Sequence, residues 1–175
     1  MTAPDDPQAE LALWLDRFKQ LRLGDETWAY HTFADLIDRH GAFYPPAPWP
    51  AGQHPQRTNQ CFAAAHEWAD RMGWTYVEGL ALVPGSMFPV FGHAWCLTPS
   101  GTVADPAIPD GWAAGYLGVP FSTRFRHTLR ETRPGTALVT AGPLELGRPY
   151  YGPNTTILRE GLPPGALAPG AEHAH

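Results

Sequence analysis

The clearest pattern in the sequence is the run WTYVEGLALVPGSMFPVFGHAWCLTPSGTVAD at residues 74–105. Two segments within it, 74–83 and 89–98, are rich in aromatic and β-branched residues, which favour strands. A Pro-Gly-Ser turn at 84–86 separates the two segments. The run therefore predicts two consecutive strands joined by a turn.

A third, shorter strand is expected at 102–105. A Pro-Ser-Gly turn at 99–101 leads into it, and Pro106 ends it because a proline has no N–H to donate to a sheet. The apolar residues of 58–73 recur at helical spacing, so a helix is expected just before the strands. The predicted unit is one helix followed by a meander of strands.

Cys61 lies in the first turn of the predicted helix. Thr58 or Asn59 is a suitable N-cap for this helix. Its apolar face carries Cys61, Ala64, Ala65, Trp68 and Met72. A thiol at the positive end of the helix dipole is favoured as the thiolate, which is the nucleophilic form. Backbone N–H groups at a helix start can stabilise an oxyanion, and the side chains of Asn59 and Gln60 are candidate additional donors.

His93 and Asp105 are expected on the same face of the sheet. Because side chains alternate along a strand, His93 points away from Cys96, which selects Cys61 as the partner of His93 and argues against a zinc site. If the Pro-Ser-Gly turn pairs the residues that flank it, Asp105 lies diagonal to His93, where a carboxylate can orient the imidazole. The expected catalytic triad is Cys61, His93 and Asp105, with no metal or cofactor.

The rest of the chain is expected to support this unit. Two amphipathic helices are predicted, one from Asp6 to Gly24 and one from Asp25, as its N-cap, to about His40. The proline-rich residues 44–56 form a surface connection that ends just before Asn59 and can border a cleft.

The C-terminal third has weaker patterns. A short helix is expected from Asp110 to Tyr116, followed by β-like runs at 121–131 and 137–140. Residues 161–175 offer little to bury and are predicted to be a disordered tail. We therefore expect one α+β domain over residues 1–160, with the N-terminal helices and the Cys61 helix packed on an antiparallel β-sheet.

Composition limits the classes of function. With 175 residues, 43% of them hydrophobic, the chain can bury one sizeable core. It shows neither an export signal nor an apolar stretch of membrane-spanning length, so we expect a cytoplasmic protein with reduced cysteines and no membrane partner. A formal net charge of -5 argues against nucleic acid as the main partner. The arginine-rich residues 124–133 are interpreted as a solvated strand face, with an anion-binding surface as the alternative.

At these residues the chain resembles the transglutaminase-like and papain-like cysteine protease superfamily. The matching segments are Asn59-Gln60-Cys61-Phe62, Gly92-His93-Ala94-Trp95 and Val103-Ala104-Asp105-Pro106. They follow the family order of a cysteine at a helix start, then a histidine and an aspartate on successive strands, and they span about residues 58–107. The resemblance implies acyl transfer from a peptide, protein or small amide through a thioester, with water or an amine as acceptor.

Each candidate residue also has a structural explanation. Cysteine and histidine can be core residues, and an aspartate before a proline can be a turn residue. Glu78 interrupts an apolar strand and is expected on the solvent face, with a polar site as the alternative. Trp95 and Tyr116 either line a cleft beside the triad or belong to the core.

Two functions from other classes compete with the enzyme. The first is a non-catalytic protein of the same fold that binds a peptide or a partner through the proline-rich segment and an aromatic cleft. The second is a nucleic-acid-associated protein that uses the arginine-rich strand.

Overall fold

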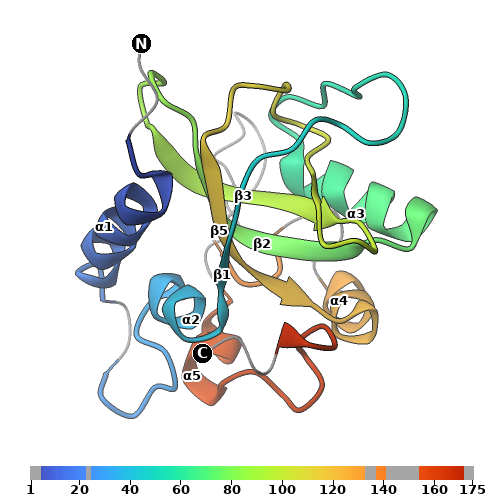
Figure 1. The fold of residues 1–175 in the computed structure, drawn as a ribbon. Coiled ribbons are helices and arrows are strands. Elements are labelled where there is room, and N and C mark those ends of the chain that lie inside the picture. The colour runs from blue at the N-terminus through green and yellow to red at the C-terminus, as the bar shows by residue number, and fades with distance from the viewer. Residues whose placement is uncertain (1–4, 23–24, 133–136, 141–153, 172–175) are drawn as a thin grey trace.

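The computed structural model describes residues 5–22, 25–132, 137–140 and 154–171 (Figure 1). Its helices are α1 (Pro7–Lys19), α2 (Phe33–His40), α3 (Cys61–Met72), α4 (Thr123–Arg130) and α5 (Thr155–Glu160). Its strands are β1 (Ala42–Tyr44), β2 (Thr75–Leu82), β3 (Val90–Leu97), β4 (Val103–Ala104) and β5 (Gly115–Phe121). The predicted mixed α+β class with an antiparallel sheet is confirmed.

The five strands form one curled sheet in the order β1-β5-β2-β3-β4, and every neighbouring pair is antiparallel. The central strand β2 pairs with β3 from Thr75 opposite Leu97 to Leu82 opposite Val90. The three predicted strands at 74–105 are therefore present and adjacent. The edge strands β1 and β4 are short, which limits the unpaired backbone that the sheet exposes.

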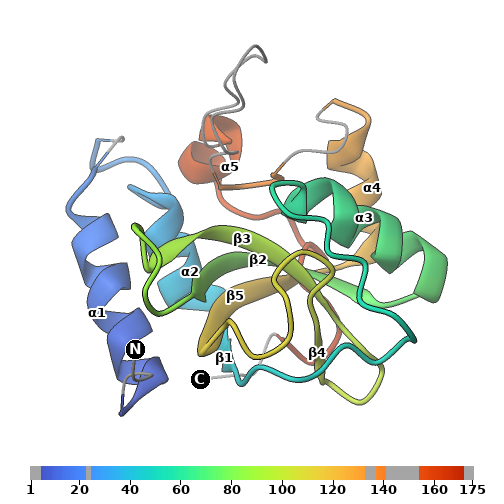
Figure 2. The ribbon, with the colours of Figure 1, turned by 90° about the horizontal axis from the view of Figure 1, so that it is seen from above.

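The two faces of the sheet are covered differently. One face packs its buried side chains, among them Leu80, Cys96 and Phe121, against the helices. The other face carries Val77, Trp95 and their neighbours, and it packs against loop residues between β1 and α3 and between β4 and β5. Figure 2 shows α3, α4 and α5 on one side of the central strands β2 and β3, and the long loops on the other side.

The two N-terminal helices form, but the second begins later than predicted. Asp6 caps α1, which ends at Lys19, before the predicted end at Gly24, a residue outside the described ranges. Helix α2 begins at Phe33 rather than near Asp25, because Thr32 and Asp35 form a reciprocal capping box. Asp25 instead accepts hydrogen bonds from the backbone and side chain of Thr27 in an exposed turn.

Residues 110–131 were assigned incorrectly from the sequence. The predicted helix at 110–116 and strand at 121–131 are replaced by strand β5 and helix α4. Ser122 caps α4 by accepting from the N–H of Phe125. Arg126 and Arg130 both donate to Asp70, so part of the predicted basic surface is neutralised by an ion-pair cluster. These hydrogen bonds hold the pKa of Asp70 low even though burial acts to raise it.

The C-terminal residues also differ from expectation. Residues 137–140 are not a strand, and a fifth helix, α5, follows them in the described chain. The prediction of a disordered tail is wrong for 161–171, where Leu167 bridges to Phe121 and the Ala168 N–H donates to Pro120. Residues 172–175 lie outside the described part.

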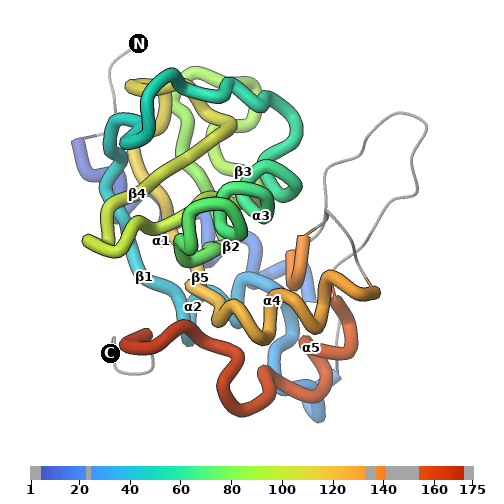
Figure 3. Tube along the Cα trace, turned by 90° about the vertical axis from the view of Figure 1, so that its right-hand side faces the viewer, coloured from blue at the N-terminus to red at the C-terminus, as the bar shows by residue number. Residues whose placement is uncertain are grey.

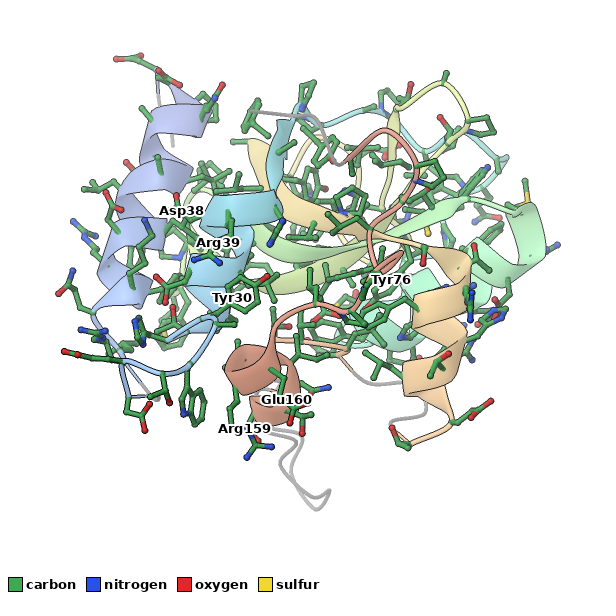
Figure 4. All side chains as sticks on the ribbon, turned by 90° about the horizontal axis from the view of Figure 1, so that it is seen from below. Tyr30, Asp38, Arg39, Tyr76, Arg159 and Glu160 are labelled. Atoms are coloured by element: carbon green, nitrogen blue, oxygen red, sulfur yellow. The ribbon has the colours of Figure 1, made fainter. Side chains whose placement is uncertain are left out.

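Helix α5 is joined to the segment before α2. The N–H groups of Ala29 and Tyr30 donate to the carbonyls of Arg159 and Leu158. Figure 4 shows Arg39 facing the ring of Tyr30, 4.9 Å from its centroid. No helix among the described residues is both long and apolar enough to cross a bilayer.

Candidate active site

Helix α3 begins at Cys61, so the cysteine lies in the first turn, as the sequence predicted, although the helix starts later than the expected residue 58. Its N-cap is Gln60 rather than Thr58 or Asn59, and this cap makes no side-chain hydrogen bond to the helix. Asn59 has a left-handed backbone with φ of 63°. The first N–H groups of α3 are therefore not capped by the Gln60 side chain, which leaves them able to hydrogen-bond a ligand.

Asn59 and Gln60 are both exposed beside the start of α3. The side-chain oxygen of Gln60 accepts from Nε and Nη2 of Arg57 at 3.0 and 2.7 Å. Its amide nitrogen remains available to a ligand at the surface. Asn59 and Gln60 are the two proposed side-chain donors. The side chain of Gln60 is held in place by its hydrogen bonds to Arg57.

The proline-rich segment is fixed along the loop that follows β4. The Arg57 N–H donates to the carbonyl of Pro106 at 2.9 Å, and the Trp49 N–H donates to Asp110 Oδ1 at 3.0 Å. The ring of Trp49 packs against Trp68 of α3 at 4.8 Å between centroids. Figure 3 shows the segments that follow β1 and β4 running beside each other. These contacts bring the start of α3 next to the end of β4.

His93 and Asp105 form a buried hydrogen-bonded pair. Nε2 of His93 lies 2.7 Å from Oδ2 of Asp105, and the two side chains are 2% and 5% exposed. The β3–β4 register places Leu97 opposite Val103, so the turn pairs its flanking residues as predicted. The predicted proximity of His93 and Asp105 is therefore confirmed.

The carboxylate of Asp105 is held by further donors. Oδ1 accepts from the N–H groups of Ala107 and Ile108 at 2.8 and 3.1 Å, and Oδ2 accepts from the hydroxyl of Tyr116 at 2.9 Å. Burial acts to raise the pKa of Asp105, but His93 and the backbone donors outweigh it, so this pKa is lowered. Asp105 is therefore a fixed, ionised neighbour of the imidazole.

Cys61 is the second ionisable neighbour of the His93 imidazole, and its interaction with the ring is among the causes that raise the pKa of His93. Since Nε2 is bound to Asp105, Nδ1 is the ring nitrogen left for the thiol. Burial acts to lower the pKa of His93, but the charges of Asp105 and Cys61 and their hydrogen bonds raise it to about 10. The structure thus brings Cys61, His93 and Asp105 together, with Cys61 and Asp105 as the two ionisable neighbours of the imidazole.

Trp95 and Tyr116 lie behind the imidazole and do not line an open cleft. Trp95 is fully buried, and its ring stacks beside His93 at 6.3 Å between centroids. Tyr116 packs on Trp95 at 4.9 Å and is 3% exposed. Both residues are core neighbours of the pair, so a contact with substrate is not possible in this conformation.

Glu78 belongs to a different polar cluster. The expectation that it faces solvent is wrong, because it is completely buried. Its carboxylate accepts from the N–H groups of Leu138, Val139 and Thr140 and from the hydroxyl of Tyr76. It packs on the helix-covered face of the sheet, as Tyr76 does, whereas His93 stacks with Trp95 on the opposite face.

The role of Tyr116 as a donor to Asp105 was missed in the sequence because 110–116 was assigned to a helix. If 115–121 is a strand paired with β2, Tyr116 stands opposite Ala81, which itself pairs with Phe91 on β3. That register places Tyr116 on the face that carries His93. The β-like composition of 115–121 could have indicated this strand, but its glycines and Pro120 disfavour a strand assignment.

The described residues offer few alternatives for a ligand site. They contain no group of three or more His, Cys, Asp or Glu side chains placed to hold a metal ion. One cavity of about 300 Å³ opens beside Tyr44, Thr98 and Pro169, and none of the three triad residues lines it. The triad is the stronger candidate site, because it combines buried charge with a nucleophile.

Comparisons with known proteins identify no relative. No protein-family model matches the chain, and neither the curated proteins nor the solved structures that were searched contain a significant match.

Proposed function

We propose that this protein is a thiol-dependent acyl-transfer enzyme of papain-like or transglutaminase-like type. The observation that carries the proposal is the position of His93, with Nε2 at 2.7 Å from Asp105 and with Cys61, the first residue of α3, as its other ionisable neighbour. A histidine held by a carboxylate beside a thiol is the arrangement that nucleophilic catalysis requires.

The proposed reaction begins with transfer of the Cys61 proton to Nδ1 of His93. The sulfur then attacks the carbonyl carbon of an amide, and the carbonyl oxygen becomes an oxyanion that the N–H groups at the start of α3 stabilise. As the C–N bond breaks, His93 returns the proton to the leaving amine, and a thioester remains on Cys61. Asp105 holds the ring in place and stabilises its protonated form.

The second half of the reaction releases the acyl group. His93 removes a proton from water or from an amine, this nucleophile attacks the thioester, and the Cys61 thiol leaves with a proton. Water gives hydrolysis or deamidation, and an amine gives transfer. The proposed substrate is a peptide, protein or small amide, and the chemistry needs no cofactor. A reducing compartment keeps Cys61 as a thiol, so the proposal goes with a cytoplasmic location.

A second candidate is a non-catalytic protein on the same fold that binds a peptide or a partner. The observation that favours it is the limited access to the site, because Cys61 is only 9% exposed and His93 only 2%. A catalytic cysteine must admit a substrate carbonyl. This candidate therefore predicts a thiol that reacts slowly at every pH.

The deciding experiment is the pH dependence of Cys61 alkylation by iodoacetamide in the native full-length chain. Cys61→Ala is the blank, because Cys96 is buried and burial raises its pKa. We expect alkylation to persist well below the pKa of about 8.5 of a free thiol. In His93→Ala the rate near neutral pH should fall about tenfold or more, since the thiolate loses its counter-ion.

The matched control is His127→Ala, because His127 is exposed and contacts Asp70 rather than the triad. It should leave the alkylation profile unchanged. If Cys61 is inert, or titrates like a free thiol both in the wild-type protein and in His93→Ala, the result contradicts the enzyme proposal and favours the binding protein.

A further inference from the structure

The hydroxyl of Tyr116 reaches the same carboxylate oxygen as the imidazole. It donates to Asp105 Oδ2 at 2.9 Å, and His93 Nε2 lies 2.7 Å from that oxygen. We propose that Tyr116 is a positioning residue that acts through Asp105: its hydroxyl donates to Oδ2 and shares the charge on that oxygen, which limits how strongly Asp105 stabilises a protonated His93. The relevance to catalysis rests on the function proposed above.

Tyr116 comes from a strand that supplies no triad residue. It lies on β5, which pairs with β2 and β1, whereas His93 is on β3 and Asp105 directly follows β4. Its ring is fixed between Trp95, at 4.9 Å, and His93, at 6.2 Å between centroids. Because the ring is only 3% exposed, water does not compete for the hydroxyl.

Oδ1 and Oδ2 of Asp105 have separate functions in this geometry. Oδ1 is bound by the backbone of Ala107 and Ile108, which fixes one end of the carboxylate. Oδ2 is left to two side chains, Tyr116 and His93. A neutral hydroxyl that donates to Oδ2 reduces the charge with which this oxygen can stabilise a protonated imidazole. Its removal should therefore favour the protonated form of His93.

The groups that face this pair are few. His93 has Asp105 after β4 and the ionisable Cys61 from α3 as its neighbours, and Asp110 acts on Tyr116 from the same loop as Asp105. Burial and the neighbouring Asp105 both raise the pKa of Tyr116 strongly, so its hydroxyl keeps its proton and remains a donor. The titration that Tyr116 controls is thus that of His93.

The test is the titration of His93 in the full-length chain, followed by NMR of ¹⁵N-labelled histidine. The signal of His93 is assigned by its loss in His93→Gln. In Tyr116→Phe we expect the midpoint of the His93 titration to rise by about one pH unit, because Oδ2 of Asp105 loses a hydrogen bond that shares its charge.

Tyr76→Phe is the matched control. Tyr76, labelled in Figure 4, is also a buried tyrosine whose hydroxyl donates to a buried carboxylate, that of Glu78 at 2.8 Å. The Tyr76→Phe substitution removes the same hydroxyl group from a tyrosine that contacts neither Asp105 nor His93. The His93 midpoint should be unchanged in this variant. An unchanged midpoint in Tyr116→Phe, or an equal shift in Tyr76→Phe, overturns the proposal.

A double-mutant cycle separates a positioning role from general loosening. If Tyr116 acts through Asp105, Tyr116→Phe should cause no further shift of His93 in an Asp105→Asn background. A full additional shift in that background overturns the proposal. If Tyr116→Phe does not fold, the hydroxyl proton of Tyr116 in the native chain is measured instead. Slow exchange with water that is lost in Asp105→Asn supports the bond, and exchange as fast as that of an exposed tyrosine overturns it.

Alkylation of Cys61 on the same samples distinguishes this inference from the proposed function. A His93 midpoint that shifts in Tyr116→Phe, together with a Cys61 that reacts as a free thiol, supports the positioning role and contradicts acyl transfer. An activated Cys61, together with an unchanged His93 midpoint in Tyr116→Phe, supports acyl transfer and contradicts the positioning role.

Discussion

The N–H of Arg57 donates to the carbonyl of Pro106 over 2.9 Å, which joins the approach to α3 to the residue after Asp105. The two outer members of the triad are thus connected by backbone a short distance from each. A backbone contact of this kind does not depend on a side-chain rotamer. It fixes the approach to Cys61 against the loop that carries Asp105.

The stability of the protein should depend on pH through His93. Its pKa is about 10 in the folded chain and 6.5 as an ordinary histidine. A raised pKa stabilises the folded state fully below pH 6.5, and this contribution is lost as the pH rises through about 10. We expect Asp105→Asn to cost about 3 kcal/mol of unfolding free energy in mildly acidic solution and much less above the folded pKa.

Urea denaturation across this pH range measures the effect. His93→Gln is the control, because the loss of either partner should remove the same pH-dependent contribution. A difference between the wild-type protein and Asp105→Asn that stays constant with pH would mean that the pair is not ionised in the folded state.

The buried Glu78 should be needed to hold residues 137–140 on the sheet. Its two oxygens accept from the N–H groups of Leu138, Val139 and Thr140 and from two hydroxyls. In Glu78→Gln an NH₂ group would face these donors, so we expect a loss of about 3 kcal/mol in chemical denaturation.

Glu67→Gln is a suitable comparison for this variant. Glu67 lies on the surface of α3, with its side chain 55% exposed, and pairs with Arg57 at 3.2 Å. Its replacement should cost less than about 1 kcal/mol. Equal losses in the two variants would contradict the clamping role of Glu78.

The sequence predicted the part of the fold in which one local rule determines the geometry. Alternation along β3 gives the facing of His93 and Cys96, and the Pro-Ser-Gly turn sets the Thr98 N–H against the Thr102 carbonyl at 2.9 Å. These two facts together position Asp105. Catalytic roles do not follow from such rules, so the activity of the triad stays a proposal.

Helix α4 and strand β5 could not be predicted, because the contacts that determine them involve residues distant in the sequence. The alternation of Phe125, His127 and Leu129 with arginines fits a strand, but the segment forms helix α4, in which Arg126 is buried and donates to Asp70 of α3. Strand β5 contains Pro120, a residue that disfavours strands. It is tolerated because the neighbouring strand β1 pairs only with 116–118.

The capping box of α2 offers a direct test of the corrected helix start. Thr32 Oγ1 accepts from the N–H of Asp35 at 3.0 Å, and the Asp35 carboxylate accepts from the N–H of Thr32 at 2.8 Å. Thr32→Ala should lower the unfolding free energy by about 1 kcal/mol. Asp25→Ala, at the helix start expected from the sequence, should have a clearly smaller effect in the same thermal unfolding assay. The reverse order would contradict the observed start.

Trp49 should control access to Cys61 without controlling its activation. The ring packs against Trp68 and Trp74 and is 8% exposed, so it anchors the proline-rich segment against α3. Trp49→Ala should cost about 3–5 kcal/mol and loosen the segment, whereas Trp49→Phe keeps an aromatic ring in the same place. We therefore expect Trp49→Ala to accelerate Cys61 alkylation by one factor at every pH, with its midpoint unchanged.

A shifted midpoint in Trp49→Ala would mean that the segment also helps to set the charge state of the thiol and imidazole. The Arg57–Pro106 contact provides a route for such an effect, because it connects the anchored segment to the loop that holds Asp105. An unchanged rate in Trp49→Ala would place the barrier to Cys61 elsewhere, in the burial of the sulfur at the start of α3. Trp49→Phe should match the wild-type rate in either case, so a change there would point to ring shape rather than to anchoring.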